Sequence, residues 1–310
     1  MLIGRSRGGP VWLNNFGGGY SFFTDFQPDE HIEGSTVVSN DAELQAAAAA
    51  AGDGDRIEID TAGSYKGVRV SINLTIAATV TGVDFSVGAG EYFGQNGSGK
   101  TLTLIALTGT TSDTNNGMIR AADGVIRVYR CWFDSTVGRI SVQSTIGGEV
   151  GDIEGYGSIF DGSAYTGANS IPVFSLDGSG LELTLRNCIV YGPQGTGTQY
   201  CIDNYQGTLN LYNNGFREGN SGTIDSTGGV MVVNDDYNAM TDNPGVMTGA
   251  HNETNITWAN WYNGAYVPQN NTAKQGGDTT NAADYDYYGN NLNDLIAALG
   301  YVPIGAIAAE

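Results

Sequence analysis

Eight consecutive residues, 94–101, read Gly-Gln-Asn-Gly-Ser-Gly-Lys-Thr and match the phosphate-binding loop pattern G-x-x-x-x-G-K-[ST] at every position. In such a loop the backbone N–H groups cradle phosphates, the lysine reaches them, and the Ser or Thr hydroxyl binds Mg²⁺. This chemistry requires a buried strand before the loop and a helix after it, so that the N-terminus of the helix meets the phosphates.

The surroundings of this motif predict a different structure. Residues 86–91 are too small and polar for a buried strand, and residues 101–104 read Thr-Leu-Thr-Leu, whose period of two indicates another strand. The pattern also arises easily in a chain this rich in Gly, Ser and Asn. We therefore interpret Gly94, Gly99, Lys100 and Thr101 as a chance match in a turn between strands, and we predict no nucleotide cofactor.

Polysaccharide cleavage is the other chemistry that the residue types allow. Hydrolysis uses two nearby carboxylates, and elimination uses an Arg or Lys base beside carboxylates that hold Ca²⁺. The candidates are Arg127, Arg130, Asp235 and Asp236, with Arg186 as a further cation and with acids at positions 134, 152, 161 and 177. No dense set of Asp recurs at one repeat position, and both histidines lie outside the repeats. We predict no catalytic residues; a polysaccharide lyase or hydrolase stays the alternative, and Ca²⁺ binding stays open.

The elements that would position these groups are short strands in a repeat. Five stretches share one template: apolar, any, apolar, any, any, small or polar, any, aromatic or apolar. They are Ile126-Val128-Cys131-Phe133, Ile153-Gly155-Ser158-Phe160, Leu183-Leu185-Cys188-Val190, Leu209-Leu211-Asn214-Phe216 and Val230-Val232-Asp235-Tyr237. The third slot advances by 27, 30, 26 and 21 residues. A period of this size with two-residue alternation predicts β-rungs stacked around one core.

Amide side chains gather where these rungs turn. We expect them to hydrogen-bond along the stack or to their own backbone, and Asp235 in the third slot has the same structural explanation. These residues are Asn187, Asn213, Asn214 and Asn234.

Composition agrees with a turn-rich, all-β protein. Gly contributes 47 of the 310 residues, and the net charge is −20. Such a surface repels phosphate backbones and anionic lipids, so we predict no nucleic-acid partner and no membrane partner. The N-terminal residues lack the apolar core of a signal peptide.

The three cysteines have no metal-type spacing. Cys131 and Cys188 occupy the same slot two rungs apart, roughly 10 Å along the stack, which is too far for a disulfide. We predict that these two and Cys201 are small buried residues of a protein made in a reducing cytosol.

Helix signals flank the repeats. Asn40 can cap a helix over about 41–51, and Leu292, Leu295, Ile296 and Leu299 have helical spacing. We divide the chain into an arm (1–38), a coil of rungs (39–240) and a C-terminal capping or oligomerisation region (241–310). The arm is predicted to dock on a neighbouring protein or to fold back on its own rungs. Its candidate contact residues are Trp12, Phe16, Tyr20, Phe22, Phe23 and Phe26.

A family resemblance begins at the first predicted helix. The run from Asn40 through Gly52-Asp53-Gly54-Asp55, Ile57-Glu58-Ile59 and Gly63-Ser64-Tyr65 to Val70-Ile72-Leu74-Ile76 resembles the opening of right-handed parallel β-helices of the pectate-lyase-like class. This implies a single-stranded coil over about residues 39–240 whose open end is covered by the small helix. It specifies a fold and no activity. Asp235-Asp236 resembles the paired-Asp element of polygalacturonase-like enzymes, although their Asn-Thr-Asp, Gly-His-Gly and Arg-Ile-Lys elements are absent.

The whole architecture is similar to that of bacteriophage tailspike and head-decoration proteins, in which a β-helix often trimerises around its long axis. That similarity implies a non-enzymatic virion surface protein, made in the host cytoplasm, without a cofactor. We expect a homotrimer that decorates the capsid and is anchored through residues 1–38 to the major capsid protein or a tail protein. The alternative is a tailspike-like β-helix that binds or cleaves a glycan.

Overall fold

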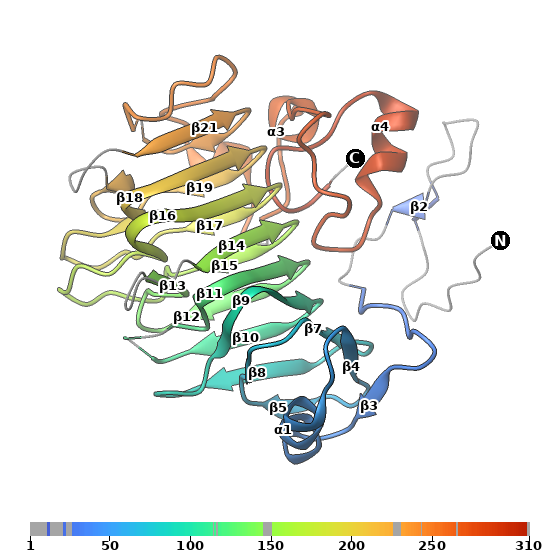
Figure 1. The fold of residues 1–310 in the computed structure, drawn as a ribbon. Coiled ribbons are helices and arrows are strands. Elements are labelled where there is room, and N and C mark those ends of the chain that lie inside the picture. The colour runs from blue at the N-terminus through green and yellow to red at the C-terminus, as the bar shows by residue number, and fades with distance from the viewer. Residues whose placement is uncertain are drawn as a thin grey trace.

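The computed structural model describes residues 27–113, 115, 117–144, 151–225, 231–242, 244–264 and 266–308, and the backbone of two short strands within residues 11–22. The chain forms a parallel β-helix of about seven turns (Figure 1). The prediction of an all-β parallel coil with a short helix near each end is therefore confirmed.

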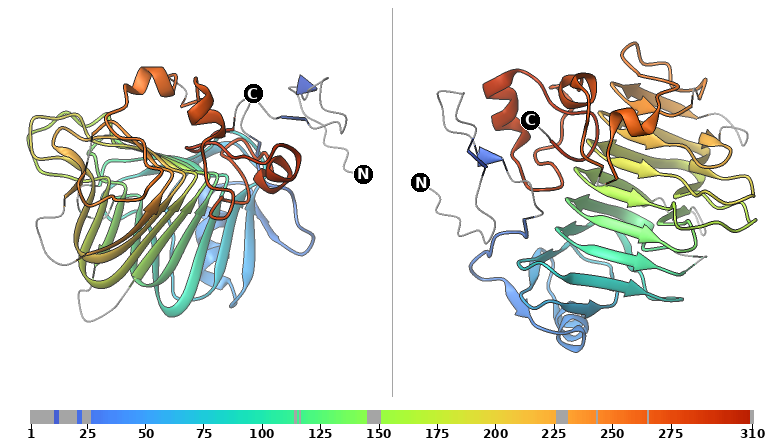
Figure 2. Two further views of the ribbon diagram at one scale, coloured as in Figure 1. Left: turned by 90° about the horizontal axis from the view of Figure 1, so that it is seen from above. Right: turned by 180° about the vertical axis from the view of Figure 1, so that it is seen from behind.

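Three faces of parallel strands enclose the interior of the coil, which Figure 2 (left) shows along the stack. Four long strands bend near their middle, so each contributes its first half to one face and its second half to another. The bend lies where the pairing register shifts, or where two separate strands pair with the two halves. These are β9 (Phe93–Ile105), β11 (Ile119–Tyr129), β16 (Phe174–Arg186) and β18 (Tyr200–Tyr212).

Face 1 consists of the first halves of the four long strands together with β6 (Arg69–Val70), β13 (Ser141–Ser144) and β20 (Gly222–Asp225). Face 2 consists of their second halves together with β3 (Thr36–Val38), β4 (Asp55–Ile59), β7 (Leu74–Ala78), β14 (Gly151–Tyr156) and β21 (Val232–Asp236). Face 3 consists of β5 (Gly63–Tyr65), β8 (Val83–Val87), β10 (Thr108–Thr111), β12 (Trp132–Ser135), β15 (Ile159–Asp161), β17 (Ile189–Tyr191), β19 (Gly215–Arg217) and β22 (Ala239–Met240).

Apolar side chains point inward from every face and stack in register. On face 2, Ile126, Ile153, Leu183 and Leu209 are successive partners and are fully buried. On face 3, the phenylalanines of β12 and β15 form a similar column with Val190 and Phe216. This continuous core is what one rung cannot form alone, because each rung buries its apolar side only against its neighbours.

A sharp corner joins face 2 to face 3 in each rung. One residue there adopts a left-handed conformation, with φ between 50° and 60°. These corner residues are Ala106, Arg130, Gly157, Asn187, Asn213 and Tyr237. The next residue begins the turn into face 3, and its side chain points into the coil, as the burial of Cys131, Ser158, Cys188 and Asn214 shows.

The fifth predicted repeat is wrong in register by three residues. Val233 pairs with Leu209 and Asp235 with Leu211, and Asn238, not Asp235, occupies the third slot. The buried amides form a ladder in that slot: Cys188 N donates to Asn214 Oδ1 at 2.9 Å, and Asn214 N donates to Asn238 Oδ1 at 3.0 Å. The expected hydrogen bonds along the stack are thus confirmed for Asn214 and also for Asn234, whose Nδ2 donates to Asn210 Oδ1 at 2.8 Å. Asn187 and Asn213 bond the C-terminal region instead.

Each end of the coil is covered. Helix α1 (Asp41–Ala50) lies under the first rungs and buries Leu44 fully against the core, as predicted. Its cap is Asn40, whose side chain accepts a hydrogen bond from Glu43 N at 3.0 Å. At the other end Met247 reaches the core from the loop that follows β22. Parallel pairing begins at residue 36, because β3 already pairs with β4.

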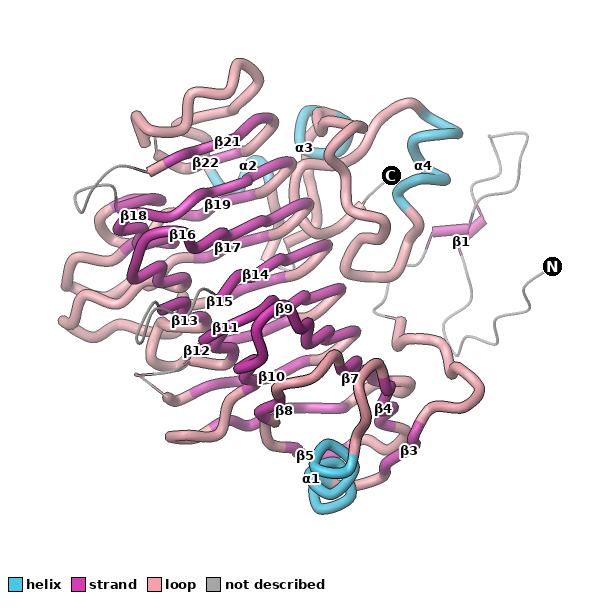
Figure 3. The backbone as a smooth tube through the Cα atoms, viewed as in Figure 1, coloured by secondary structure: helices cyan, strands magenta, loops and turns pink. Residues whose placement is uncertain are grey.

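The C-terminal region (residues 257–308) runs back along the side of the coil instead of extending it. It contains α2 (Trp258–Trp261), α3 (Asn271–Gln275) and α4 (Leu292–Leu299), and α4 ends at Gly300 as its spacing predicts. Two corner residues hold it: Asn187 bonds Ala283 N and Pro303 O, and Asn213 bonds the backbone N and O of Asp278. A second apolar cluster, which includes Tyr262, then packs against Ile159 and Ile189 of face 3. Figure 3 shows the helices and loops of this region beside the strands of the coil.

Candidate functional site

The phosphate-loop motif lies inside β9. Residues 97–100 bulge outward where Asn96 pairs with Asp123 and Thr101 with Val125, so the segment is a bend within one rung and not a turn between rungs. The next element is strand β10. Lys100 Nζ is 3.1 Å from the Asp53 carboxylate, which ties the bulge to the loop before β4, two rungs back. Gly94 lies in a regular part of face 1, and Gly99 adopts φ +66° in the exposed bulge.

The two candidate cationic residues of β11 and its corner form ion pairs within the chain. Arg127 lies on the outside of face 2 with its Nε 2.7 Å from Glu154 Oε2. Arg130 is a buried corner residue, and its Nη2 lies 2.6 Å from Asp29 Oδ1. Its guanidinium also lies 5.8 Å from the centre of the Tyr285 ring. Arg130 therefore joins three segments of the chain at one corner.

Asp235 and Asp236 close the last rung. Asp235 Oδ2 accepts a hydrogen bond from Gly249 N at 3.1 Å and another from the Asn252 amide. Asp236 accepts from His251 N at 2.8 Å, and its Oδ2 lies 2.9 Å from His251 Nδ1. Burial opposes ionisation, but the hydrogen bonds from His251 outweigh it and lower the pKa of Asp236.

The structure does not bring the four candidates together. Arg127 and Asp235 lie on strands separated by four inter-strand steps, which amount to about 19 Å. Sequence reasoning missed the Asp236–His251 pair, because the histidine comes from a loop outside the repeats. The imidazole also stacks on Tyr237, with ring centres 4.4 Å apart.

A carboxylate pair lies on the outside of face 3. Asp134 and Asp161 are direct register partners on β12 and β15, so their Cα atoms are about 4.8 Å apart. Partial burial raises the pKa of Asp134 to about 6, although Trp132 Nε1 donates to Asp134 Oδ1 at 2.6 Å. The hydroxyl of Tyr266, from the C-terminal region, donates to Asp161. Two acids that the sequence placed only as scattered neighbours therefore adjoin each other.

The outer side of face 2 carries a mixed polar and aromatic ladder. Tyr129 and Tyr156 stack with ring centres 4.9 Å apart, and the Tyr156 hydroxyl donates to Glu154 at 2.9 Å. Further along the stack the Arg186 guanidinium lies 5.9 Å from the centre of the Tyr212 ring. These contacts link the outer side chains of neighbouring rungs along face 2.

Residues 27–35 are fastened to the side of the coil by charge. Asp29 bridges two cations: its Oδ1 meets Arg130, and its Oδ2 lies 2.7 Å from Arg56 Nη2. Glu58, fully buried, accepts from Ile32 N and from Arg56 Nε at 2.8 and 2.7 Å. Burial alone would raise the pKa of Glu58, but these hydrogen bonds and those from His31 and Ser35 lower it to about 2.

The arm itself contains one short antiparallel pair, β1 (Val11–Trp12) with β2 (Ser21–Phe22), which the sequence did not predict. Trp12 and Phe22 lie in these strands. The other predicted contact residues lie outside the described residues: Phe16, Tyr20, Phe23 and Phe26.

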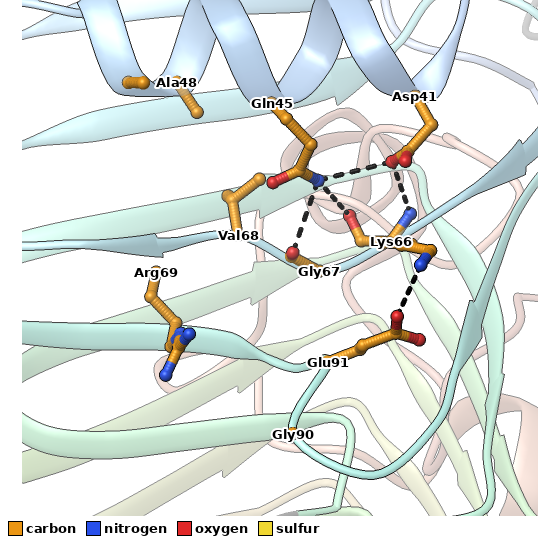
Figure 4. Close-up of a pocket in the computed structure, with 10 residues that line it drawn as sticks. Asp41, Gln45, Ala48, Lys66, Gly67, Val68, Arg69, Gly90 and Glu91 are labelled. Atoms are coloured by element: carbon orange, nitrogen blue, oxygen red, sulfur yellow. Dashed lines mark hydrogen bonds and ion pairs between the residues drawn. The ribbon is translucent and has the colours of Figure 1, made fainter.

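One hollow opens between α1 and face 1 (Figure 4). Its volume is about 520 Å³, and Gln45 and Asp41 descend into it from the helix. Lys66 and Glu91 meet at its rim at 2.5 Å, and Arg69 extends on its other side. No candidate from the sequence belongs to this hollow.

Within the described ranges, no group of three or more His, Cys, Asp or Glu side chains is placed to hold a metal ion. The three cysteines are buried free thiols, as predicted. None of the described helices is both long and apolar enough to cross a membrane. In comparisons with known proteins, no family model, no curated protein and no solved structure matches this chain.

Proposed function

We propose that this chain is a non-enzymatic protein of a bacteriophage surface, built on a pectate-lyase-like β-helix and anchored to the major capsid protein or a tail protein by its N-terminal arm. One observation carries the proposal: Asp29 and Glu58 fasten residues 27–35 to the side of a rigid coil. The arm therefore starts from a fixed point, held by the partly buried ion pairs of Asp29.

The engagement of the candidate catalytic residues supports the same proposal. Arg127 and Arg130 are held by carboxylates of the chain, and Asp235 is occupied by backbone and amide donors of the closing loop. Side chains that bond to other parts of the same chain in this way stabilise the coil. We include a homotrimer and a capsid-decoration role in the proposal, with a glycan as the alternative partner.

The first experiment is quantification of the chain against the major shell protein in purified particles of the phage that encodes it. Copy numbers comparable with the shell subunit support decoration, and a few dozen or fewer support a tail location. Absence from the particles refutes the proposal. Light scattering of the purified chain tests the trimer.

The anchor is tested by deleting residues 1–26, because residues 27–35 are fastened to the side of the coil. We expect the shortened chain to keep its far-UV circular dichroism and to lose co-sedimentation with particles that lack the protein. The full-length chain is the control. Equal binding of both chains would show that the arm is not the anchor.

A glycan-cleaving function has one specific observation in its favour. Asp236 orients His251 through Nδ1 and leaves Nε2 accessible on a half-exposed imidazole, as a general base requires. The test is release of reducing or unsaturated ends from host surface polysaccharide. Activity that His251→Ala removes and His31→Ala keeps would replace the structural proposal with this one.

A further inference from the structure

Arg130 contacts the start of the arm and the C-terminal region at the same time. On one side its Nη2 lies 2.6 Å from Asp29 Oδ1, and its Nη1 donates to Gln27 O at 3.3 Å. On the other side its guanidinium lies 5.8 Å from the centre of the Tyr285 ring. One side chain therefore joins two segments that come from opposite ends of the chain (Figure 1).

A glycine lets the C-terminal region come this close. Residues 285–291 form a tight turn, here called the C-terminal turn, which backbone hydrogen bonds and a short bridge close. Within it Gly289 has a φ of +90°, and a Cβ there would lie 2.8 Å from Arg130 Nη1 and 3.5 Å from Gln27 Cβ. Because the three groups are packed so closely, a shift of Arg130 changes the packing of the turn.

Charges of alternating sign continue from Arg130 through the start of the arm. Asp29 Oδ2 lies 2.7 Å from Arg56 Nη2, and Arg56 Nε lies 2.7 Å from Glu58 Oε1. The side chains of Arg130 and Arg56 are only 10% and 14% exposed. Water therefore screens these pairs weakly, and the loss of one member leaves its neighbour with an unpaired, partly buried charge.

The C-terminal turn carries a further acid of this series. Asp286 is fully buried and accepts hydrogen bonds from Asn290 N at 2.7 Å and from Ala308 N at 2.9 Å, so it connects the turn to the end of the chain. Burial raises the pKa of Asp286 to about 6, and its hydrogen bonds and the charge of Arg130 act against that rise. Arg130 thus stabilises the ionised forms of two carboxylates, Asp29 on the arm and Asp286 in the turn.

We propose that Arg130 couples the start of the arm to the C-terminal turn, so that each segment is held more firmly while the other is in place. A partner that draws residues 27–29 away from the coil then loosens the turn, and a partner that keeps them in place protects it. Such coupling acts equally in both directions. It depends on contacts within this chain alone and holds for any partner of the arm, so it goes beyond the proposed function.

Hydrogen exchange of the full chain, followed by mass spectrometry, tests the coupling from the arm side. Asp29→Asn removes the carboxylate that pairs with Arg130, and we expect exchange in the C-terminal turn to become at least about fivefold faster. Asp53→Asn is the matched control. It removes the carboxylate of another ion pair, that with Lys100, and should leave exchange in the turn unchanged.

Gly289→Ala tests the coupling from the other side. Its added Cβ would displace the guanidinium of Arg130, so exchange within residues 27–35 should become faster although the substitution lies in the turn. Gly54→Ala is the control here, because Gly54 also has a positive φ but has open space around it. It should leave residues 27–35 as they are in the unmodified chain.

Arg130→Asn shows whether the effect passes through this arginine. Asn187 and Asn213 occupy the same corner in later rungs with φ of 50° and 60°, so Asn fits the backbone there. Arg130→Asn should speed exchange in both segments, and Asp29→Asn added to it should change the turn no further. The proposal is overturned by an unchanged turn in Asp29→Asn, or by an equal increase with and without Arg130. The amides of β16 are the internal reference, and an equal increase there would show general loosening of the coil and would also overturn it.

Discussion

Replacement of Asp134 by Asn is expected to stabilise the protein at neutral pH. Partial burial raises the pKa of the Asp134 carboxyl to about 6, so the ionised form costs folding free energy at pH 7. A rise of roughly two pKa units corresponds to about 3 kcal/mol, which is the upper limit of the gain. Asn keeps the Oδ1 acceptor for Trp132 Nε1, so the packing is preserved.

The sign of the pH dependence follows from the direction of the shift. A carboxyl whose pKa is raised on folding contributes its full stability below its unfolded value near 4 and loses that contribution as the pH rises through 6. The Asp134→Asn variant lacks this dependence. Its advantage over the unmodified chain should therefore be close to zero at pH 4 and should grow toward pH 7.5.

Glu58 provides the control of opposite sign. Its pKa is lowered to about 2, so its contribution is present above pH 4.5 and is lost as the pH falls toward 2. Glu58→Gln should accordingly destabilise the chain at pH 7 by about 3 kcal/mol. Urea unfolding followed by circular dichroism at pH 7.5, 6, 5 and 4 measures Asp134→Asn, and the same measurement extended to pH 3 and 2 measures Glu58→Gln. Parallel stability curves for Asp134→Asn and the unmodified chain would refute the reasoning.

Three further outcomes follow from the corner and from the core. Asn214→Ala should lower the free energy of unfolding, measured in urea, by about 3 kcal/mol or more, because it leaves several buried hydrogen-bonding groups without a partner. Asn234→Ala, on the exposed side of face 2, is the control and should lower it by less than about 0.5 kcal/mol. Gly157→Ala should detach the C-terminal region from the coil, because the added Cβ would lie 2.2 Å from Tyr285 O and the backbone has a φ of +52°. The measurement is faster proteolysis within residues 257–308. Gly54 has open space around it, so Gly54→Ala is the control and should leave the rate of proteolysis unchanged. Burial raises the pKa of the Cys131 and Cys188 thiols to about 12 and raises that of Cys201 as well. None of the three should therefore react with a thiol reagent before the chain unfolds, and rapid reaction of the native protein would contradict their buried placement.

The coil could be predicted from the sequence because its inward slots are apolar and recur about once per rung. The fifth repeat escaped because Met231, Val232 and Val233 are consecutive apolar residues and allow more than one register. In the register that forms, Asp235 takes an inward position at the last rung. An acid in a core slot contradicts the pattern, and it is tolerated there because the closing loop supplies its hydrogen bonds.

The asparagines show a second limit of reasoning from residue types. Asn187 and Asn214 both lie at turns, and either could have joined a ladder. The left-handed backbone of Asn187, with φ 50°, places it at the corner itself, where it bonds the C-terminal region; Asn214 follows its corner and turns inward. One residue of offset decides between the two roles, and the sequence pattern did not resolve it.

The arrangement of Arg69 and Arg120 around Tyr92 on face 1 was harder still to predict. Arg69 and Arg120 are 51 residues apart in the sequence, and their relation depends on the register through Gly94. The strands of this face also lack clear alternation, because Gly and Ser fill the bulge of β9. A glycine between two cations in adjacent rungs is a usable signal only once the register is known.

The path of the C-terminal region decides which surfaces a partner can reach. Its contacts fall on the corner residues Asn187 and Asn213 and on the outer side of face 3, around Ile189. A partner that docks along the coil must therefore meet face 1 or the outer ladder of face 2. Face 1 carries Arg69 beside Tyr92, and the outer side of face 2 carries the Arg127–Glu154 ion pair. If residues 1–26 hold the protein on a particle, the contacts of Arg130 with Asp29 and with Gln27 O fix the point on the coil from which they start.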